Sequence, residues 1–193
     1  MPFLLPPRPG ELHVSSATNQ LLGEFNKLQH RLDELRVLLR KEIAGEELPT
    51  GEFYVLVSRT EGEMIGMLIQ HVDEVLPLCQ LTAMPDSAPW VAGLLNLGGE
   101  MVPVLDLSVK ISKHAHELEL SDLIIVCQVD GKRLGVIVKE VLGVEQLVST
   151  RVQAVPENVS FAPYLLGAAE IEHHAVLILN MPSVSSGLGL EET

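Results

Sequence analysis

The most constraining feature of this sequence is an internal repeat of strand-like segments. The segment GMLIQHVDEV (66–75) reappears as GVIVKEVLGV (135–144), a shift of 69 residues. The segment GLLNLGGEMVPVLDL (93–107) reappears as GAAEIEHHAVLILNM (167–181), a shift of 74 residues. Two copies are too few for a solenoid, which needs about three repeats to bury a continuous core. The repeat therefore predicts a body of two paired sheets or barrels that meet along a seam.

Each copy is predicted to contain short strands joined by tight turns, because apolar runs alternate with pairs of turn residues. The predicted turns are Glu61-Gly62, Gly98-Gly99, Asp130-Gly131 and Glu172-His173. The predicted strands are 53–59, 63–69, 72–78, 90–97 and 100–107 in the first copy, and 122–129, 132–138, 141–148, 164–171 and 174–181 in the second. Gly66 and Gly135 fall inside strands, where a glycine marks a sharp bend or a close backbone approach. This pattern predicts two small antiparallel barrels.

The rest of the chain divides by composition. Proline and glycine punctuate residues 1–17, which predicts a flexible leader. Residues 18–44 are predicted to form an amphipathic helix, since apolar residues recur there at spacings of four and three. Residues 45–52 form a linker, 53–183 the β-rich domain and 184–193 a frayed tail. The apolar residues of this helix, called the leucine stripe below, are Leu21, Phe25, Leu28, Leu32, Leu35 and Leu39.

The leucine stripe has two interpretations. An isolated helix of this length is only marginally stable in water, so its apolar side needs another surface. Residues 18–43 either pack on their own domain, or pair with another chain as a short coiled coil or a docking helix. The sequence leaves both interpretations open.

The charge of the chain excludes two classes of partner. The formal net charge is −13. Residues 1–51 contain six Lys/Arg and seven Asp/Glu, so the remaining body carries a net charge of −12. Such a body does not suit nucleic acid or an anionic membrane surface, both of which attract basic residues. No apolar stretch of about 18 residues predicts a membrane span. The acidic body is explained either by solubility or by a partner with a basic face.

No motif in the sequence predicts catalysis or a cofactor. The chain contains no GxSxG, HExxH, phosphate-binding glycine loop or dinucleotide fingerprint. His114 and His116 could share a face with Glu117 as a weak ligand, but surface histidines are the simpler interpretation and no metal is predicted. Cys79 and Cys127 are not part of a CxxC motif, so both are predicted to be buried thiols in a reducing cytosol.

GLLNLGGEMVPVLDLS (93–108) resembles the signature hairpin of CheW-like proteins, the coupling adaptors of bacterial chemotaxis. The resemblance extends in order through 63–75, 88–93 and 131–144, and covers about residues 53–182. It implies a mostly β fold of two intertwined five-stranded SH3-like barrels around a shared apolar core, here with an N-terminal helical extension. It also implies a non-catalytic cytoplasmic protein that reaches the membrane only through receptor complexes.

The resemblance further implies two partners. Members of this family connect the cytoplasmic tip of chemoreceptors to a histidine kinase whose regulatory domain has the same fold. One barrel pairs with a barrel of the kinase through an apolar patch, and the receptor tip binds between the barrels. Carried over position by position, the partner-binding residues are Val72, Val75, Gly93, Asn96, Gly98, Gly99 and Gly135.

The sequence departs from the family pattern at the tip of the signature hairpin. Gly98 stands where family members commonly have an arginine, whose planar guanidinium would otherwise be available for carboxylates or carbonyls. This departure predicts a divergent chemosensory or twitching-motility pathway. The alternative function is a self-assembling scaffold or an inhibitor of kinase arrays, acting through the leucine stripe.

Overall fold

The structure is a computed structural model, and it describes residues 23, 27, 47–111, 117–156, 158–159, 161–186 and 188. The predicted leader, the leucine stripe, His114 and His116 lie outside the described residues.

Most of the described chain is β-strand, and each predicted strand is present with its ends shifted by two residues or fewer. The strands of the first copy are β1 Glu52–Arg59, β2 Met64–Leu68, β3 Val72–Pro77, β4 Val91–Leu97 and β5 Glu100–Leu105. Those of the second copy are β6 Leu123–Val129, β7 Lys132–Val138, β8 Glu140–Val148, β9 Leu165–Ile171 and β10 His174–Leu179. The helical elements are η1 Ile69–His71, α2 Ser108–Ile111, η2 Ser149–Arg151, η3 Ala162–Tyr164 and α3 Met181–Ser186.

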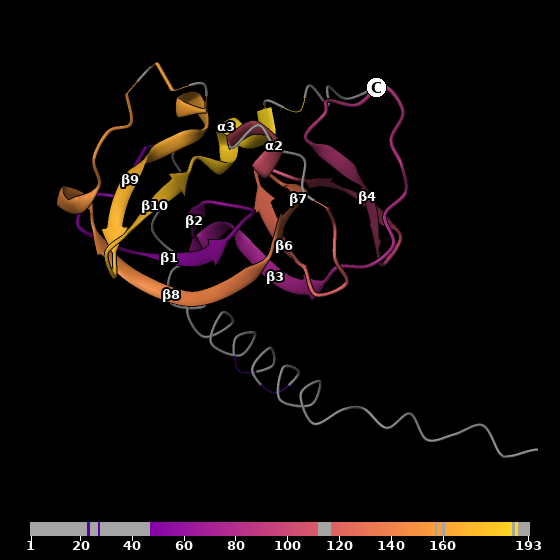
Figure 1. Ribbon diagram of the computed structural model, residues 1–193, viewed down its shortest axis with the longest axis horizontal. Helices are drawn as coiled ribbons and strands as arrows, with labels where there is room; N and C mark the ends of the chain where they lie inside the picture. The colour runs from indigo at the N-terminus through magenta and orange to yellow at the C-terminus, as the bar shows by residue number, and fades with distance from the viewer. Residues whose placement is uncertain are drawn as a thin grey trace, which may run out of the picture.

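The described strands form two five-stranded sheets that lie side by side (Figure 1). The sheet with the order β8-β1-β2-β10-β9 is called barrel 1, and the sheet with the order β3-β6-β7-β5-β4 is called barrel 2. Each barrel takes two strands from one copy of the repeat and three from the other. The two copies are therefore intertwined, as the family resemblance implied. The sheets are not purely antiparallel, because β2 pairs in parallel with β10 and β5 pairs in parallel with β7.

Both sheets close on themselves through a single backbone bridge. In barrel 1, Gln153 follows β8 and forms a bridge with Ala168 on the opposite edge strand, β9. In barrel 2, Thr82 follows β3 and forms a bridge with Leu94 on β4. These bridges pair the edges that would otherwise offer free backbone groups to other chains. Both sheets are thus small closed barrels, and they are related by the internal repeat.

The chain moves from one barrel to the other over very short distances. After β2 in barrel 1, the three-residue turn Ile69–His71 leads directly into β3 of barrel 2. After β7 in barrel 2, only Lys139 precedes β8 of barrel 1. Helices α2 and α3 follow the last strand of each copy, and both were missed from the sequence. Since α3 continues to Ser186 and buries Val184, the start of the predicted tail belongs to the body.

The apolar core has three parts. One cluster fills each barrel, around Val55 and Val57 in barrel 1 and around Ile124 and Val126 in barrel 2. The third and largest cluster lies between the barrels and includes Trp90. Because the largest apolar cluster lies between the barrels, each barrel needs the other to bury it.

Two glycines of the repeat allow close packing inside the barrels. A Cβ atom on Gly66 would lie 2.9 Å from Cδ1 of Ile178. A Cβ atom on Gly135 would lie 2.8 Å from Cγ2 of Ile124 and 3.1 Å from Cγ2 of Val104. These close neighbours are core side chains and not the backbone atoms that the sequence led us to expect, and no larger residue fits without displacing one of them.

Candidate partner-binding surfaces

The tip of the β4–β5 hairpin is exposed and built from glycine. Gly98 and Gly99 have φ angles of +62° and +97°, as a two-residue hairpin turn with positive φ at both central residues requires. The side-chain oxygen Oδ1 of Asn96 accepts a hydrogen bond from the Gly99 N–H at 2.9 Å. A Cβ atom at either glycine would meet nothing within 4 Å. The structure therefore brings Asn96, Gly98 and Gly99 together at one accessible tip.

Gly93 lies on the same hairpin but has a structural role there. Its φ angle is +150°, and a Cβ atom at this position would lie 2.7 Å from the carbonyl oxygen of Thr82. The close approach permits the backbone bridge between Thr82 and Leu94 that closes barrel 2. Gly93 thus shapes the barrel that carries the hairpin, as Gly135 does from inside the same barrel.

Val72 and Val75 lie on β3 with their side chains enclosed. Each residue is only 1% exposed, and both belong to the cluster between the barrels. Their equivalents on β8, Val141 and Val144, are half-buried at the rim of the same cluster. On the described surface, the rim of the cluster between the barrels is therefore more open along β8 than along β3.

A cationic side chain lies beside the hairpin tip although Gly98 lacks one. Nη2 of Arg133, on β7, lies 3.3 Å from Oδ2 of Asp73, and its Nη1 lies 3.4 Å from Oε2 of Glu100, the residue after the turn. The Arg133 side chain is 34% exposed. Sequence reasoning missed this residue, because Asp73 and Arg133 come from different copies of the repeat. Arg133 joins three strands and places a guanidinium near the tip, paired with two carboxylates.

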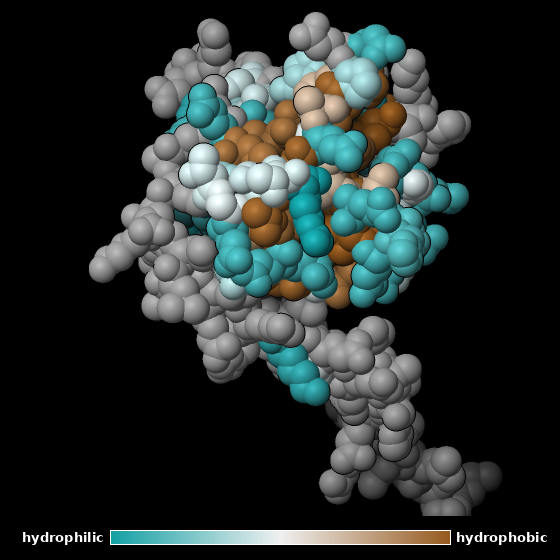
Figure 2. Space-filling model, turned by 90° about the vertical axis from the view of Figure 1, so that its left-hand side faces the viewer, coloured by the Kyte–Doolittle hydropathy of each residue, from teal (hydrophilic) through white to brown (hydrophobic). Residues whose placement is uncertain are grey.

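The corresponding positions of barrel 1 carry no such ion pairs. The repeat relates Asp73 to Leu142 and Arg133 to Met64. Leu142 is 40% exposed, and Met64 is half-buried against the core of barrel 1. Figure 2 shows hydrophobic side chains among hydrophilic ones on the left-hand side of the molecule in Figure 1, where barrel 1 lies. Barrel 1 is therefore the more apolar of the two related surfaces at these positions.

An aromatic cluster braces the seam between the two copies. Trp90 and Tyr164 occupy equivalent positions of the repeat, and their ring centroids are 5.9 Å apart. The Lys110 ammonium lies 4.2 Å from both centroids and donates a hydrogen bond to the Tyr164 hydroxyl at 2.9 Å. An ammonium over two rings is held by cation–π attraction, which strengthens when water is excluded. Lys110 therefore fixes α2 of the first copy against η3 of the second.

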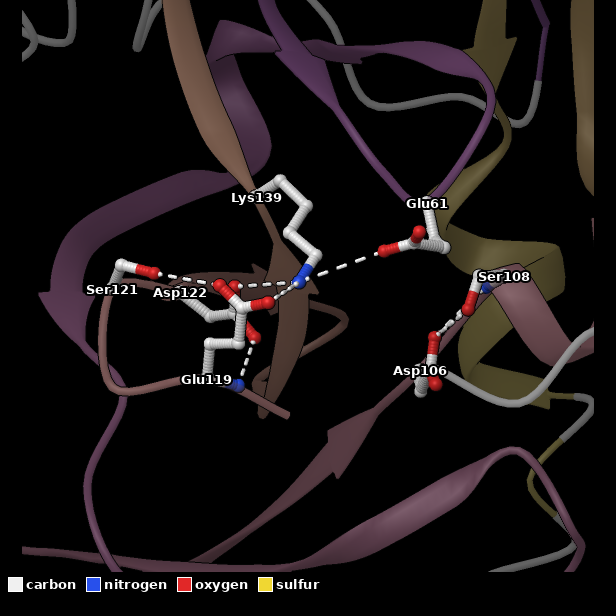
Figure 3. A network of polar contacts seen from close by, with 7 residues as sticks. All are labelled: Glu61, Asp106, Ser108, Glu119, Ser121, Asp122 and Lys139. Atoms are coloured by element: carbon white, nitrogen blue, oxygen red, sulfur yellow. Dashed lines mark hydrogen bonds and ion pairs between the residues drawn. The ribbon is translucent and has the colours of Figure 1, made fainter. Parts of the chain in front are cut away.

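A second polar network holds the crossover from barrel 2 to barrel 1 (Figure 3). The Lys139 Nζ atom lies 3.4 to 3.5 Å from carboxylate oxygens of Glu61, Glu119 and Asp122. Asp122 is fully buried, and its Oδ2 accepts a hydrogen bond from the Glu119 N–H at 2.8 Å. Burial alone would lower the pKa of Lys139, but Asp122, then Glu119 and Glu61, raise it above its ordinary value. The network therefore keeps Lys139 charged where the chain changes barrels.

The other crossover contains a titratable histidine. His71 ends the turn between β2 and β3. Burial lowers the pKa of His71, against the opposing effects of a backbone hydrogen bond at Gln128 and the negative charge of Asp130. The ring is therefore neutral at physiological pH.

Neither metal binding nor membrane insertion is supported by the described residues. Within them, no group of three or more His, Cys, Asp and Glu side chains could hold a metal ion. Glu117 is described, but the two histidines predicted beside it are not. No helix in the described part of the chain is both long and apolar enough to span a bilayer.

A CheW-like domain matches residues 54–188, which is most of the β-rich body. The chain belongs to the CheW-like family. It is 25% identical over 143 residues to the chemotaxis protein CheW of Rhizobium meliloti (strain 1021), covering 73% of this chain and 92% of that protein. It is 22% identical over 141 residues to the chemotaxis protein CheW of Thermotoga maritima, covering 73% of this chain and 93% of that protein.

A solved structure shows the same fold. The scaffolding protein TtCheW from Thermoanaerobacter tengcongensis superposes with a TM-score of 0.61 at 22% sequence identity, over 72% of this chain and 90% of that one. CheW-like proteins are non-catalytic adaptors. The prediction that the chain is not an enzyme is confirmed by its family.

Proposed function

We propose that this CheW-like protein couples the cytoplasmic tip of chemoreceptors to a chemotaxis-type histidine kinase in the bacterial cytoplasm. The observation that carries the proposal is the exposed hairpin tip of Asn96, Gly98 and Gly99, held on a closed barrel within a domain of this family. A tip held by the Asn96–Gly99 hydrogen bond suits docking of a helical partner, because little flexibility is lost on binding.

The more apolar surface of barrel 1 supports a second contact in this proposal. Leu142 and Met64 lie where barrel 2 has Asp73 and Arg133. An apolar patch without buried charges is the kind of surface that can pair with the regulatory domain of a kinase. The two barrels would then serve different partners, with the receptor at the tip of barrel 2 and the kinase at barrel 1.

The repeat offers a matched test of receptor docking. Gly98→Asp adds a charged side chain at the β4–β5 tip, where a φ of +62° and open space accept it. His173→Asp places the same carboxylate at the equivalent β9–β10 tip, where φ is +67°, by replacing an imidazole that is 97% exposed. Gly98→Asp is expected to weaken binding of a receptor-tip fragment and receptor-dependent kinase activation about tenfold, whereas His173→Asp leaves both unchanged. Equal effects of the two variants would contradict docking at the β4–β5 tip.

The absence of arginine at position 98 supports a divergent chemosensory or twitching-motility pathway within this proposal. Arg133 lies beside the tip in space, but Asp73 and Glu100 already pair with its guanidinium. Gly98→Arg is expected to improve binding to receptors of ordinary chemotaxis pathways and not to the native receptor. Surface plasmon resonance with both receptor fragments measures this difference.

Self-association through residues 18–43 is the competing function, and the heptad spacing of the leucine stripe favours it. It predicts that the full chain sediments as a dimer or larger species at micromolar concentration. Replacing Leu28 and Leu35 by glutamate would then yield a monomer. A full chain that sediments as a monomer rules out this function.

A further inference from the structure

One face of the body has apolar side chains that are less covered than the repeat leads one to expect. Tyr54 on β1 and Val141 and Val144 on β8 point toward the cluster between the barrels and are half-buried at its rim. Val72 and Val75, the equivalents of the two β8 valines, are each 1% exposed. These three half-buried residues are called the β8 face.

The side chains of the β8 face lie on one surface of the strand pair. Leu56 of β1 pairs with Val144, and Tyr54 pairs with Gln146. Because side chains alternate along a strand, Tyr54 and Leu56 project to the same side. Leu56 is buried in the cluster between the barrels, so this side is the one that leads into that cluster.

One end of the β8 face carries a negative charge. Glu52 lies on the same side of β1 as Tyr54, and its Oε2 accepts a hydrogen bond from the Gln146 side chain at 2.8 Å. Glu52 is exposed. At the other end of β8, Glu140 pairs with Arg59 on the opposite side of the strand pair, at 3.5 Å. An apolar segment with a basic border therefore complements this face in hydrophobicity and, at the Glu52 end, in charge.

The chain contains such a segment. Residues 27–41 include five basic and two acidic residues, a net charge of +3, whereas the body that follows residue 51 has a net charge of −12. In the heptad defined by the leucine stripe, Arg31 and Arg36 occupy the positions that flank the apolar residues. The expected helix thus combines a leucine stripe with arginines on both of its borders.

The connection to the body allows this segment to reach the β8 face. The Gly51 N–H donates to Oγ of Ser149 at 3.1 Å, and the Ser149 N–H donates to the Gly51 carbonyl at 2.9 Å, so the chain enters the body at the end of β8. A strand of this length extends about 30 Å. The expected helix would be about 39 Å long, which is enough to follow the whole strand.

We propose that the leucine stripe of this chain packs along its own β8 face, covering Tyr54, Val141 and Val144 while Arg36, nearer the linker, approaches Glu52. The occupant is the same molecule, because a short linker gives the stripe a far higher effective concentration than a second copy would have. This packing is a contact of the chain with itself, and it goes beyond the receptor and kinase contacts proposed above.

The test measures the accessibility of the β8 face in the full chain. Val144→Cys places a thiol on the face, and its alkylation rate by a maleimide is followed by mass spectrometry. The native cysteines are internal references, since Cys127 is buried as predicted, whereas Cys79 is exposed, contrary to the prediction. Leu28→Glu with Leu35→Glu disrupts the stripe, and Asn26→Glu with His30→Glu adds the same groups away from it.

With the stripe disrupted, alkylation of Val144→Cys is expected to accelerate about tenfold, because the stripe no longer buries that site. The off-stripe pair leaves the rate unchanged, and neither pair alters the Cys79 rate. Cys127 stays unreactive in every variant, which shows that the body remains folded. Equal rates with and without the stripe would overturn the proposal. Protection that grows with protein concentration would overturn it in favour of a second copy.

Discussion

The two equivalent glycines inside the barrels are expected to respond differently to the same substitution. In Gly135→Ala, the new Cβ atom would meet Cγ2 of Ile124 at 2.8 Å and Cγ2 of Val104 at 3.1 Å. Both atoms belong to β-branched side chains whose χ1 angles are stiff, so the backbone has to move. In Gly66→Ala, the nearest atom is Cδ1 of Ile178 at 2.9 Å, the far end of a side chain that can rotate away.

The expected magnitudes follow from this geometry. Overpacking a core costs about 1–3 kcal/mol. Replacing glycine by alanine recovers about 0.4–1 kcal/mol by restricting the unfolded chain. Gly135→Ala should therefore lower the free energy of unfolding by about 1–2 kcal/mol, a fall in Tm of about 2–8 °C for a chain of this size. Gly66→Ala should lower it by less than about 1 kcal/mol.

Urea unfolding followed by tryptophan fluorescence measures both values, because the single tryptophan, Trp90, lies in the core between the barrels. The two variants serve as controls for each other, since they occupy the same position of the repeat. If Gly66→Ala proves as destabilising as Gly135→Ala, the argument from side-chain stiffness is wrong.

Three further outcomes are expected. Burial raises the pKa of the Cys127 thiol to about 12, so iodoacetamide should modify exposed Cys79 at pH 8 and reach Cys127 only after unfolding, as peptide mapping would show. Because the pKa of His71 is lowered on folding, the unfolded chain binds its proton more readily, and stability falls as the pH drops below 6.5. Urea midpoints at pH 7.5 and 5.5 should therefore differ less in His71→Gln than in the unmodified chain. The Ser58 hydroxyl is buried without a hydrogen-bond partner, so Ser58→Ala should raise the urea midpoint or leave it unchanged, and a clear fall would reveal a partner for the hydroxyl.

Local signals in the sequence were sufficient to place the strands and turns. Glycine and aspartate pairs marked the hairpins, and Asp130-Gly131 indeed adopts positive φ angles of +49° and +78°. The exchange of strands between barrels is not visible in such signals. The chain turns toward a different sheet within the three residues Ile69–His71. Nothing in these three residues distinguishes them from an ordinary connection between strands of one sheet. The resemblance to the CheW-like family supplied this topology.

The candidate binding surfaces were only partly predictable. Asn96, Gly98 and Gly99 followed from the hairpin motif. The burial of Val72 and Val75 did not, because their pattern fits either an enclosed strand or an exposed apolar surface. The networks around Arg133 and Lys139 join residues that are up to 78 positions apart in the chain, as in the contact between Lys139 and Glu61. Such pairs become visible only when the intertwined topology is known.

The exchange of strands between the barrels has an evolutionary consequence. Two identical chains that traded strands in this way would form a symmetric dimer, and every substitution would change both of its sides at once. A duplicated sequence in one chain removes that restriction. Position 73 can hold an aspartate while its twin at position 142 holds a leucine, and each side of the molecule can acquire its own chemistry. One polypeptide can thereby present two chemically different surfaces although its two halves share one fold.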